Sequence, residues 1–324
     1  MTEAKEGLPQ TAADGGGQRF EVPREDAGRR LDAWLAERLS LSRAAVRRLL
    51  ARGAVRIGGT PQTGSAKGLA LRAGEQVEVD DAPRPEDERA APEPGAPLTV
   101  LAEGPGWLAV DKPAGVPVHP LSPEEGGCVL NAVAARHPEI HGVGEGALRS
   151  GVVHRLDVDT SGALLLATEE TRWQVLRQAF REHRVEKRYR AIVRGPLATD
   201  GERRLPLVVA RHQPAFVRVA RPKEQENARE TTTRWRVLER FAEASLLEVE
   251  TTSGFLHQVR AVLAHEGHPL AGDRTYAETR EAPDPTTATR HLLHAASLCV
   301  DDVAAESPDP PDFAVVLADL RARG

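Results

Sequence analysis

A stretch with almost no large apolar side chain, residues 81–97, divides this 324-residue chain into two parts. It consists mainly of Pro, Ala, Glu and Asp, a composition typical of linkers between folded units. Because such a stretch adds little to a hydrophobic core, we expect a small domain over 19–80 and a larger one over 98–324. Residues 1–18 are polar and contain three consecutive glycines, so we expect a disordered tail there.

Apolar residues at helical spacing predict two short helices in the small domain. The first contains the apolar residues between Leu31 and Leu39, and the second runs from Arg43 to Arg52 after an N-cap at Ser42. Short strands are expected over 55–57 and 76–80. Together these elements predict a small α/β module.

The net charge of −5 is unevenly distributed along the chain. Residues 19–80 contain twelve basic and eight acidic side chains, a net charge of +4, whereas acidic residues dominate 81–97 and 301–324. The second predicted helix presents four arginines with no acidic residue between them: Arg43, Arg47, Arg48 and Arg52. Such a helix suits a nucleic-acid phosphate backbone. The alternative interpretation is a solvated helix face.

The polar nonapeptide His154–Gly162 is the most informative pattern in the larger part of the chain. It lies between two apolar runs, Val152-Val153 and Ala163–Ala167, which predict buried strands. Connections between core strands are favoured positions for catalytic side chains, and Asp157 beside Arg155 is a candidate nucleophile. On spacing alone, an ordinary strand connection with solvated charges is an equal alternative.

The remaining elements of this part alternate between strands and helices. Apolar periodicity predicts helices over 170–183, 256–265 and 312–323, and a strand pair over 231–238 and 245–252.

The nonapeptide resembles the HRLDxxTSG signature of the RluA-type pseudouridine synthases, which isomerise uridine in RNA. Further segments resemble motifs of that family in the same order, and together they span about residues 98–300: Asp111–Gly115 with Val118–Pro120, Lys187–Gly195, Gly254–Arg260 with Pro269–Asp273 and Tyr276, and Arg290–Ala295. The resemblance implies an α+β catalytic domain with a mixed, largely antiparallel sheet and flanking helices. The small domain is similar to the RNA-binding module of ribosomal protein S four, in Arg30-Leu31-Asp32, Ser42-Arg43 and Gly74–Val77.

The resemblance assigns catalytic roles to three residues. Asp157 is the expected nucleophile, and Arg260 is the arginine that pairs with it. Tyr189 is expected to stack on the flipped base and to assist proton removal from its carbon five. An attack on the ribose, an addition to the base and an elimination from the ribose are all open as the route.

Six further residues are expected to contact RNA: Arg155, His257 and the four arginines of the second helix, Arg43, Arg47, Arg48 and Arg52. For Arg155, a structural ion pair is an equal alternative. One departure bears on this expectation. Gly254-Phe255-Leu256 replaces the usual Gly-Arg-Thr of the family. The change removes polar groups, so Phe255 either stacks on a base or packs in the core.

We expect neither a metal nor a cofactor, because the reaction is an isomerisation and the paired histidines lack ligand companions. No apolar run approaches the ~18 residues needed to cross a bilayer. Two distant cysteines, Cys128 and Cys299, give no disulfide framework, which favours a reducing cytoplasm. A monomer is the default expectation.

The resemblance therefore predicts an RNA pseudouridine synthase. Large-subunit ribosomal RNA is the preferred candidate substrate, and transfer RNA is the second candidate. One alternative is a non-catalytic RNA-binding or ribosome-assembly protein that keeps the fold. Another is a glycoside hydrolase that uses Asp157 and Asp159 as its carboxylate pair, which a basic helical module disfavours.

Overall fold

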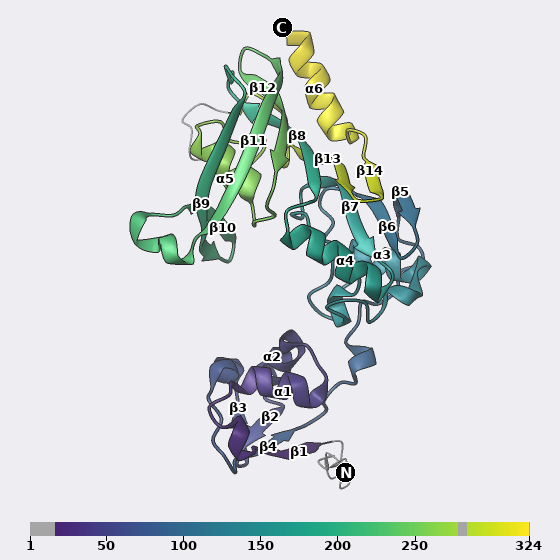
Figure 1. The fold of residues 1–324 in the computed structure, drawn as a ribbon, viewed down its shortest axis with the longest axis vertical. Helices are drawn as coiled ribbons and strands as arrows, with labels where there is room; N and C mark the ends of the chain where they lie inside the picture. Colours follow the sequence, from purple (N-terminus) through teal and green to yellow (C-terminus); the bar gives the residue numbers. More distant parts are fainter. Residues whose placement is uncertain (1–16, 278–283, 324) are drawn as a thin grey trace. The chain divides into compact units, whose positions relative to one another are not determined.

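The computed structural model describes residues 17–277 and 284–323, which form two compact units divided between Arg89 and Ala90 (Figure 1). The division falls inside 81–97, where a linker was expected. Most of the expected disordered tail lies outside the described residues. Its last residue, Gln18, begins strand β1 (Gln18–Glu21), so the prediction of disorder is wrong at this residue.

The first unit is an antiparallel sheet of four strands packed against two helices. The helices are α1 (Leu31–Leu39) and α2 (Arg43–Ala51), and the strands after β1 are β2 (Val55–Ile57), β3 (Thr60–Gln62) and β4 (Gln76–Val79), in the order β1-β4-β2-β3. Both predicted helices and both predicted strands are confirmed. The edge strands β1 and β3 escaped prediction because they are mostly exposed and carry no apolar alternation.

The apolar face of α2 explains how this small unit holds together. Its valine and leucines are buried with Trp34 against the strands, while Ser42 Oγ accepts a hydrogen bond from the Ala45 backbone N–H at 3.1 Å. This is the expected N-cap, and it fixes where the helix begins.

The second unit is built on one long sheet, in the order β10-β9-β11-β12-β8-β13-β7-β6-β5 with β14 on β13. Its strands are β5 (Thr99–Gly104), β6 (Trp107–Lys112), β7 (Ser161–Ala167), β8 (Glu186–Arg194), β9 (Gly201–His212), β10 (Ala215–Val219), β11 (Arg229–Arg240), β12 (Ala244–Thr251), β13 (Leu293–Val300) and β14 (Val303–Glu306). Within the described residues every pair is antiparallel except β7 with β13. The mixed, largely antiparallel α+β fold is confirmed.

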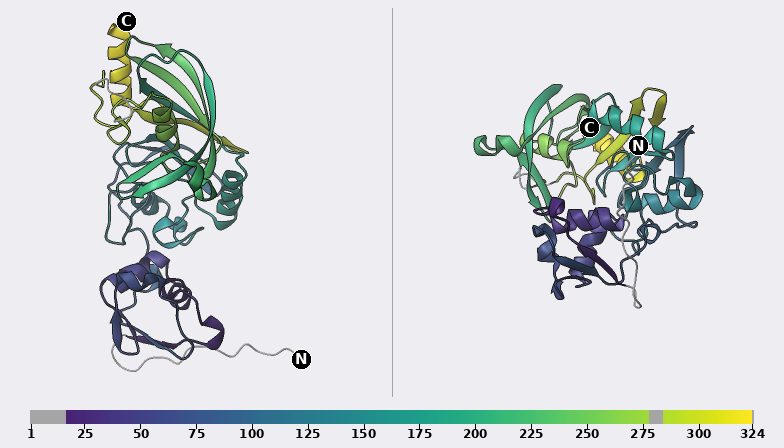
Figure 2. Two further views of the ribbon diagram at one scale, coloured as in Figure 1. Left: turned by 90° about the vertical axis from the view of Figure 1, so that its left-hand side faces the viewer. Right: turned by 60° about the horizontal axis from the view of Figure 1, so that its bottom comes forward.

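Helices flank this sheet: α3 (Val129–Arg136), α4 (Glu170–Arg181), α5 (Gln258–His265) and α6 (Pro311–Arg323). The strands β9 to β11 curve around α5, whose buried residues join their core (Figures 1 and 2). The three predicted helices α4, α5 and α6 and the predicted strand pair β11–β12 are confirmed. Helix α5 begins two residues later than expected, because His257 has a left-handed backbone with φ 51°.

The strand predicted before the nonapeptide is wrong. Val152 makes a single bridge to Leu166, and the chain then leaves the sheet. Two apolar residues are too few to sustain a hydrogen-bonded ladder, although the run that follows the nonapeptide does form the fully buried strand β7. The nonapeptide ends on Gly162 for a steric reason. A Cβ there would lie 2.2 Å from the carbonyl oxygen of Ala295 on the parallel neighbour β13.

The segment expected to be a free linker is anchored at both ends. Before the division, the Asp81 carbonyl accepts a hydrogen bond from Arg52 Nη2 at 2.6 Å. After the division, Ala90 is buried, and the Glu93 carboxylate accepts from the Gly127 backbone N–H at 3.0 Å. The segment lacks large apolar residues, but its backbone and carboxylates serve as hydrogen-bond acceptors.

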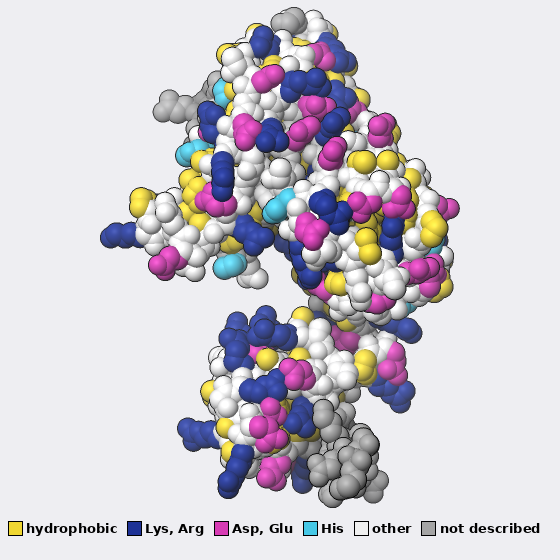
Figure 3. Space-filling view, in the orientation of Figure 1, with side chains coloured by type: hydrophobic (Ala, Val, Ile, Leu, Met, Phe, Trp, Pro, Cys, Tyr) yellow, Lys and Arg dark blue, Asp and Glu magenta, His cyan; other side chains and the backbone are white. Residues whose placement is uncertain are grey.

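Basic and acidic side chains are interspersed over the viewed face of both units (Figure 3). Among the described residues, no helix is both long and apolar enough to cross a membrane.

Candidate active site

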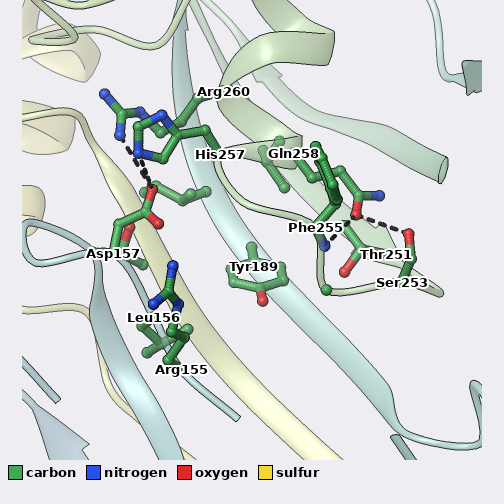
Figure 4. A pocket seen from close by; sticks show the side chains of 14 residues that line it. Arg155, Leu156, Asp157, Tyr189, Thr251, Ser253, Phe255, His257, Gln258 and Arg260 are labelled. Carbon is green, nitrogen blue, oxygen red and sulfur yellow. Dashed lines mark hydrogen bonds and ion pairs between the residues drawn. The ribbon is translucent and has the colours of Figure 1, made fainter. Parts of the chain in front are cut away.

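Asp157 lies in a pocket between the nonapeptide and the segment that leads from β12 into α5 (Figure 4). Tyr189 and Arg260 line the same pocket, together with Arg155 and His257. The pocket is small and open to solvent, with a cavity volume of about 70 Å³. The fold thus brings together five of the residues selected from the sequence.

Arg260 links Asp157 to a second, buried carboxylate. Its Nη1 donates to Asp157 Oδ2 at 3.1 Å, while its Nε and Nη2 donate to Asp273 at 2.7 and 3.0 Å. The side chain of Asp157 is 21% exposed, whereas that of Asp273 is 1% exposed. One edge of the guanidinium is therefore fixed in the protein, and the other nitrogen is directed at Asp157.

The charges in this group support one another. Burial opposes a charge on Arg260, but the hydrogen bonds and negative charge of Asp273, with those of Asp157, outweigh it and raise the pKa of the guanidinium. Burial likewise opposes ionisation of Asp273, and Arg260 outweighs it, so that the pKa of this carboxyl is lowered. Asp273 was missed as a site residue, although it belongs to the motif 269–273.

His257 lies beside Asp157, with its Nε2 3.8 Å from Asp157 Oδ2. Its left-handed backbone, which non-glycine residues rarely adopt, sits at the N-cap of α5. Burial lowers the pKa of the imidazole, so the ring is neutral at pH 7. The residue expected to contact RNA thus touches the candidate nucleophile.

Tyr189 faces the pocket from β8, while its neighbours Arg188 and Arg190 lie on the opposite side of the strand, as the alternation predicts. Burial, aided by the negative charge of Asp157, raises the pKa of Tyr189 to about 12. The phenol is therefore protonated at neutral pH. In Figure 4 its ring lies beside the opening between Asp157 and Phe255.

A buried lysine holds the loop that carries Asp157. Lys112 Nζ is fully enclosed and donates to the carbonyls of Pro113, Val116 and Val158 at 2.9, 2.7 and 2.7 Å. Burial lowers the pKa of this ammonium to about 8. Since Val158 follows the candidate nucleophile directly, Lys112 positions the Asp157 backbone. Its role was missed, although the residue stands in the motif 111–115.

The segment 290–295 anchors the other end of the same loop. Arg290 Nη1 donates to the Asp159 carbonyl at 2.9 Å, and Thr160 Oγ1 lies 2.8 Å from His291 Nε2. His154 also has a structural role. It is stacked on a phenylalanine, and its Nε2 accepts from the Leu165 backbone N–H at 3.0 Å. These contacts explain why the motifs surround Asp157 without all facing the pocket.

Arg155 is exposed, and within residues 17–277 and 284–323 it has no hydrogen-bond or ion-pair partner. It lines the pocket and also an adjoining groove rich in basic side chains: Arg149, Arg177, Arg181, Lys187 and Arg229, with Glu145 as an acidic member. The groove therefore offers several cations beside the pocket, which suits a polyanionic ligand.

Phe255, which departs from the motif, has two kinds of contact. Its ring is partly buried against the core around α5 and also lines the pocket with Asp157. Leu256 lines a separate groove on the other side of Asp157. Packing and base stacking are therefore compatible at Phe255.

The arginines of α2 are less isolated than the sequence suggested. Arg43 and Arg47 both donate to the buried carboxylate of Asp32, at 3.0 and 3.1 Å, and Arg48 pairs with Glu88. The acids come from other segments, which the local pattern could not reveal. The side chains of Arg43 and Arg47 are still 50% and 47% exposed, so each retains donors that face solvent.

Comparisons with known proteins agree on one family. Residues 106–265 match the family described as RNA pseudouridylate synthase. An uncharacterized RNA pseudouridine synthase of Mycobacterium bovis is 36% identical over 94% of this chain and 98% of its own length. The ribosomal large subunit pseudouridine synthase D of Nitrosomonas europaea is 34% identical over 93% of this chain and 87% of its own length.

A solved structure, human RNA pseudouridylate synthase domain containing 4, shares the fold. It has a TM-score of 0.55 and 24% identity, over 69% of this chain and 93% of that chain.

Proposed function

Because this chain belongs to the RNA pseudouridine synthase family, we propose that it isomerises a uridine of large-subunit ribosomal RNA with Asp157 as the nucleophile. The choice of RNA is supported by the relatives named as large-subunit enzymes, which align with this chain over most of its length. The observation that carries the chemistry is the Asp157 carboxylate, held by a fixed guanidinium inside an open pocket.

The reaction breaks the bond between ribose C1′ and N1 of the base, turns the base, and joins C1′ to C5. A carboxylate beside the flipped nucleotide assists the cleavage by forming a covalent bond or by taking a proton. Asp157 Oδ2 contacts Arg260, whereas Oδ1 has no hydrogen-bond partner among the described residues. We assign the attacking or accepting role to Oδ1.

Tyr189 contributes mainly its ring in this proposal. With a pKa of about 12, the phenol stays protonated in the unbound enzyme. This favours a role in stacking on the nucleobase over a role as a general base. Flipping places the base in the pocket, where Tyr189 and Phe255 provide apolar faces.

Site-resolved mapping of pseudouridine in cellular RNA tests this function. We expect that deleting the gene removes pseudouridine at one or a few positions of large-subunit RNA, and that the purified enzyme restores them without releasing free uracil. A loss confined to transfer RNA would mean that transfer RNA, and not ribosomal RNA, is the substrate. An unchanged map would favour the non-catalytic alternative, and released uracil would favour the hydrolase.

We also propose that the first unit binds the RNA backbone through Arg43 and Arg47. Replacing both with Gln should weaken RNA binding and lower the slope of log affinity against log salt by roughly 1–2, because each lost phosphate contact removes about 0.7–0.9. Fluorescence anisotropy with a fragment of large-subunit RNA measures both quantities.

The charge control is the pair Arg24→Gln and Arg72→Gln, which removes the same charge from exposed positions of the same unit. Because Arg43 and Arg47 also pair with the buried Asp32, urea unfolding of both double variants accompanies the binding measurement. An equal loss in both double variants would mean that only the total charge matters, and would contradict a defined contact at α2.

A further inference from the structure

Tyr276 contacts His257 and Arg260, the two side chains that pair with Asp157 among the described residues. Its Oη lies 3.2 Å from His257 Nδ1, and the Arg260 guanidinium carbon stands 5.2 Å from the centre of its ring. The residue is 2% exposed, which is too little to offer its hydroxyl to a substrate. A role in catalysis would therefore act through its neighbours.

The direction of each hydrogen bond follows from chemistry. His257 Nε2 lies 3.8 Å from Asp157 Oδ2, which is too long for a hydrogen bond, and a ring with its proton on Nε2 presents the positive end of its dipole to that anion. Because burial lowers the pKa of the imidazole, the ring is neutral and Nδ1 is an acceptor. Burial also raises the pKa of Tyr276 to about 12, so its hydroxyl keeps the proton that it donates to Nδ1.

The same hydroxyl oxygen is fixed from its other side by strand β10. The Val217 backbone N–H donates to Tyr276 Oη at 2.9 Å, and the Phe216 ring stacks on the tyrosine with centroids 5.0 Å apart. Pro214 and Ala215, at the turn from β9 into β10, line the groove that contains Asp157 and His257. The β9–β10 hairpin is thus connected to the pocket by contacts that meet at Tyr276.

We propose that Tyr276 is a positioning residue that holds His257 in the tautomer with a proton on Nε2, directed at Asp157, and anchors this arrangement to the β9–β10 hairpin. The inference rests on the proposed role of Asp157 as nucleophile. His257 then supplies a fixed N–H dipole beside the carboxylate, with no added net charge. Without the tyrosine hydroxyl the imidazole can rotate or change tautomer, and the carboxylate loses a defined neighbour.

Tyr276→Phe is the direct test, because it keeps the ring that stacks on Phe216 and removes only the hydroxyl. We expect kcat to fall about 10- to 100-fold, as is usual when the orienting partner of a histidine is lost, with KM nearly unchanged. Nitrogen-15 NMR of histidine-labelled protein, assigned with His257→Gln, should show the Nε2–H tautomer in the wild type and a mixture in Tyr276→Phe.

A double-mutant cycle separates positioning from a general effect on the fold. In a His257→Gln background, Tyr276→Phe should reduce kcat no further, because the group through which it acts is already gone. Fully additive losses would overturn the proposal. A wild-type spectrum in which His257 carries its proton on Nδ1 would also overturn it, and this result does not depend on the folding of Tyr276→Phe.

The outcomes also distinguish this inference from the proposed function. A wild-type enzyme that forms no pseudouridine in any RNA contradicts the function itself. If the enzyme is active but the losses of kcat in Tyr276→Phe and His257→Gln add fully, only the proposed role of Tyr276 is contradicted.

Discussion

Replacing Asp157 with Asn is expected to lower pseudouridine formation by more than about 10⁴-fold, as is typical when a nucleophile is removed. Asparagine keeps the size of the side chain and an oxygen that can accept from Arg260, but it lacks the charge that makes the carboxylate reactive. Because this side chain is partly exposed, the fold and RNA affinity should be nearly unchanged. Release of tritium from RNA labelled at C5 of uridine measures turnover directly, since the isomerisation exchanges that hydrogen.

Asp159→Asn is the matched control for this experiment. It changes an exposed carboxylate two residues away on the same loop, and the structural contact of Asp159 is made by its backbone carbonyl. Its turnover should stay near that of the wild type. Substantial tritium release by Asp157→Asn would remove the proposed nucleophile, and equal inactivity of both variants would favour a carboxylate pair.

The second large effect is expected for Arg260→Met. The variant leaves the buried Asp273 charge without its partner, which typically destabilises a protein by ~3–5 kcal/mol. Turnover should also fall by about 10²- to 10³-fold, because Asp157 loses its only hydrogen-bonded cation in the described structure. Urea unfolding and tritium release measure the two effects separately.

The contribution of the Arg260–Asp273 pair to stability should depend on pH in a defined direction. The folded-state pKa of Asp273 lies below its ordinary value of 3.8, so its ion pair stabilises the fold above that pH and is lost as the pH falls through the lowered pKa. Arg260→Met should therefore lose less stability on acidification below pH 4 than the wild type does.

The double variant Arg260→Met with Asp273→Asn distinguishes the structural role of Arg260 from its catalytic role. Neutralising the stranded carboxylate should restore part of the lost stability, because an asparagine oxygen can still accept from the Thr275 backbone N–H. Turnover should stay low. Recovered turnover would mean that the Arg260–Asp157 contact is dispensable.

Local patterns predicted the elements whose apolar residues repeat regularly. Helices α2, α4 and α6 and strand β2 carry clear periodicity or apolar runs, and their positions were found to within about two residues. The exposed edge strands have no such pattern, and Val152-Val153 was too short to compete for a place in the sheet.

The pocket could be predicted only through resemblance to a family. Asp157 and Arg260 are 103 residues apart, and no spacing rule connects them. Lys112, Asp273 and Tyr276 were not recognised as site residues, because a buried polar side chain has no periodic signature and its partners are distant in the sequence. The pairing of the α2 arginines with Asp32 and Glu88 was hidden for the same reason.

The shared guanidinium has a consequence for the energetics of the reaction. Two carboxylates, Asp157 and Asp273, meet one arginine, so this ionic triad holds one surplus electron charge in the resting enzyme. If Asp157 forms an ester with ribose C1′, the bond from C1′ to N1 breaks and the negative charge passes from the carboxylate to the released base. A covalent intermediate would thus make the triad electroneutral and move its surplus charge onto the base that remains in the pocket.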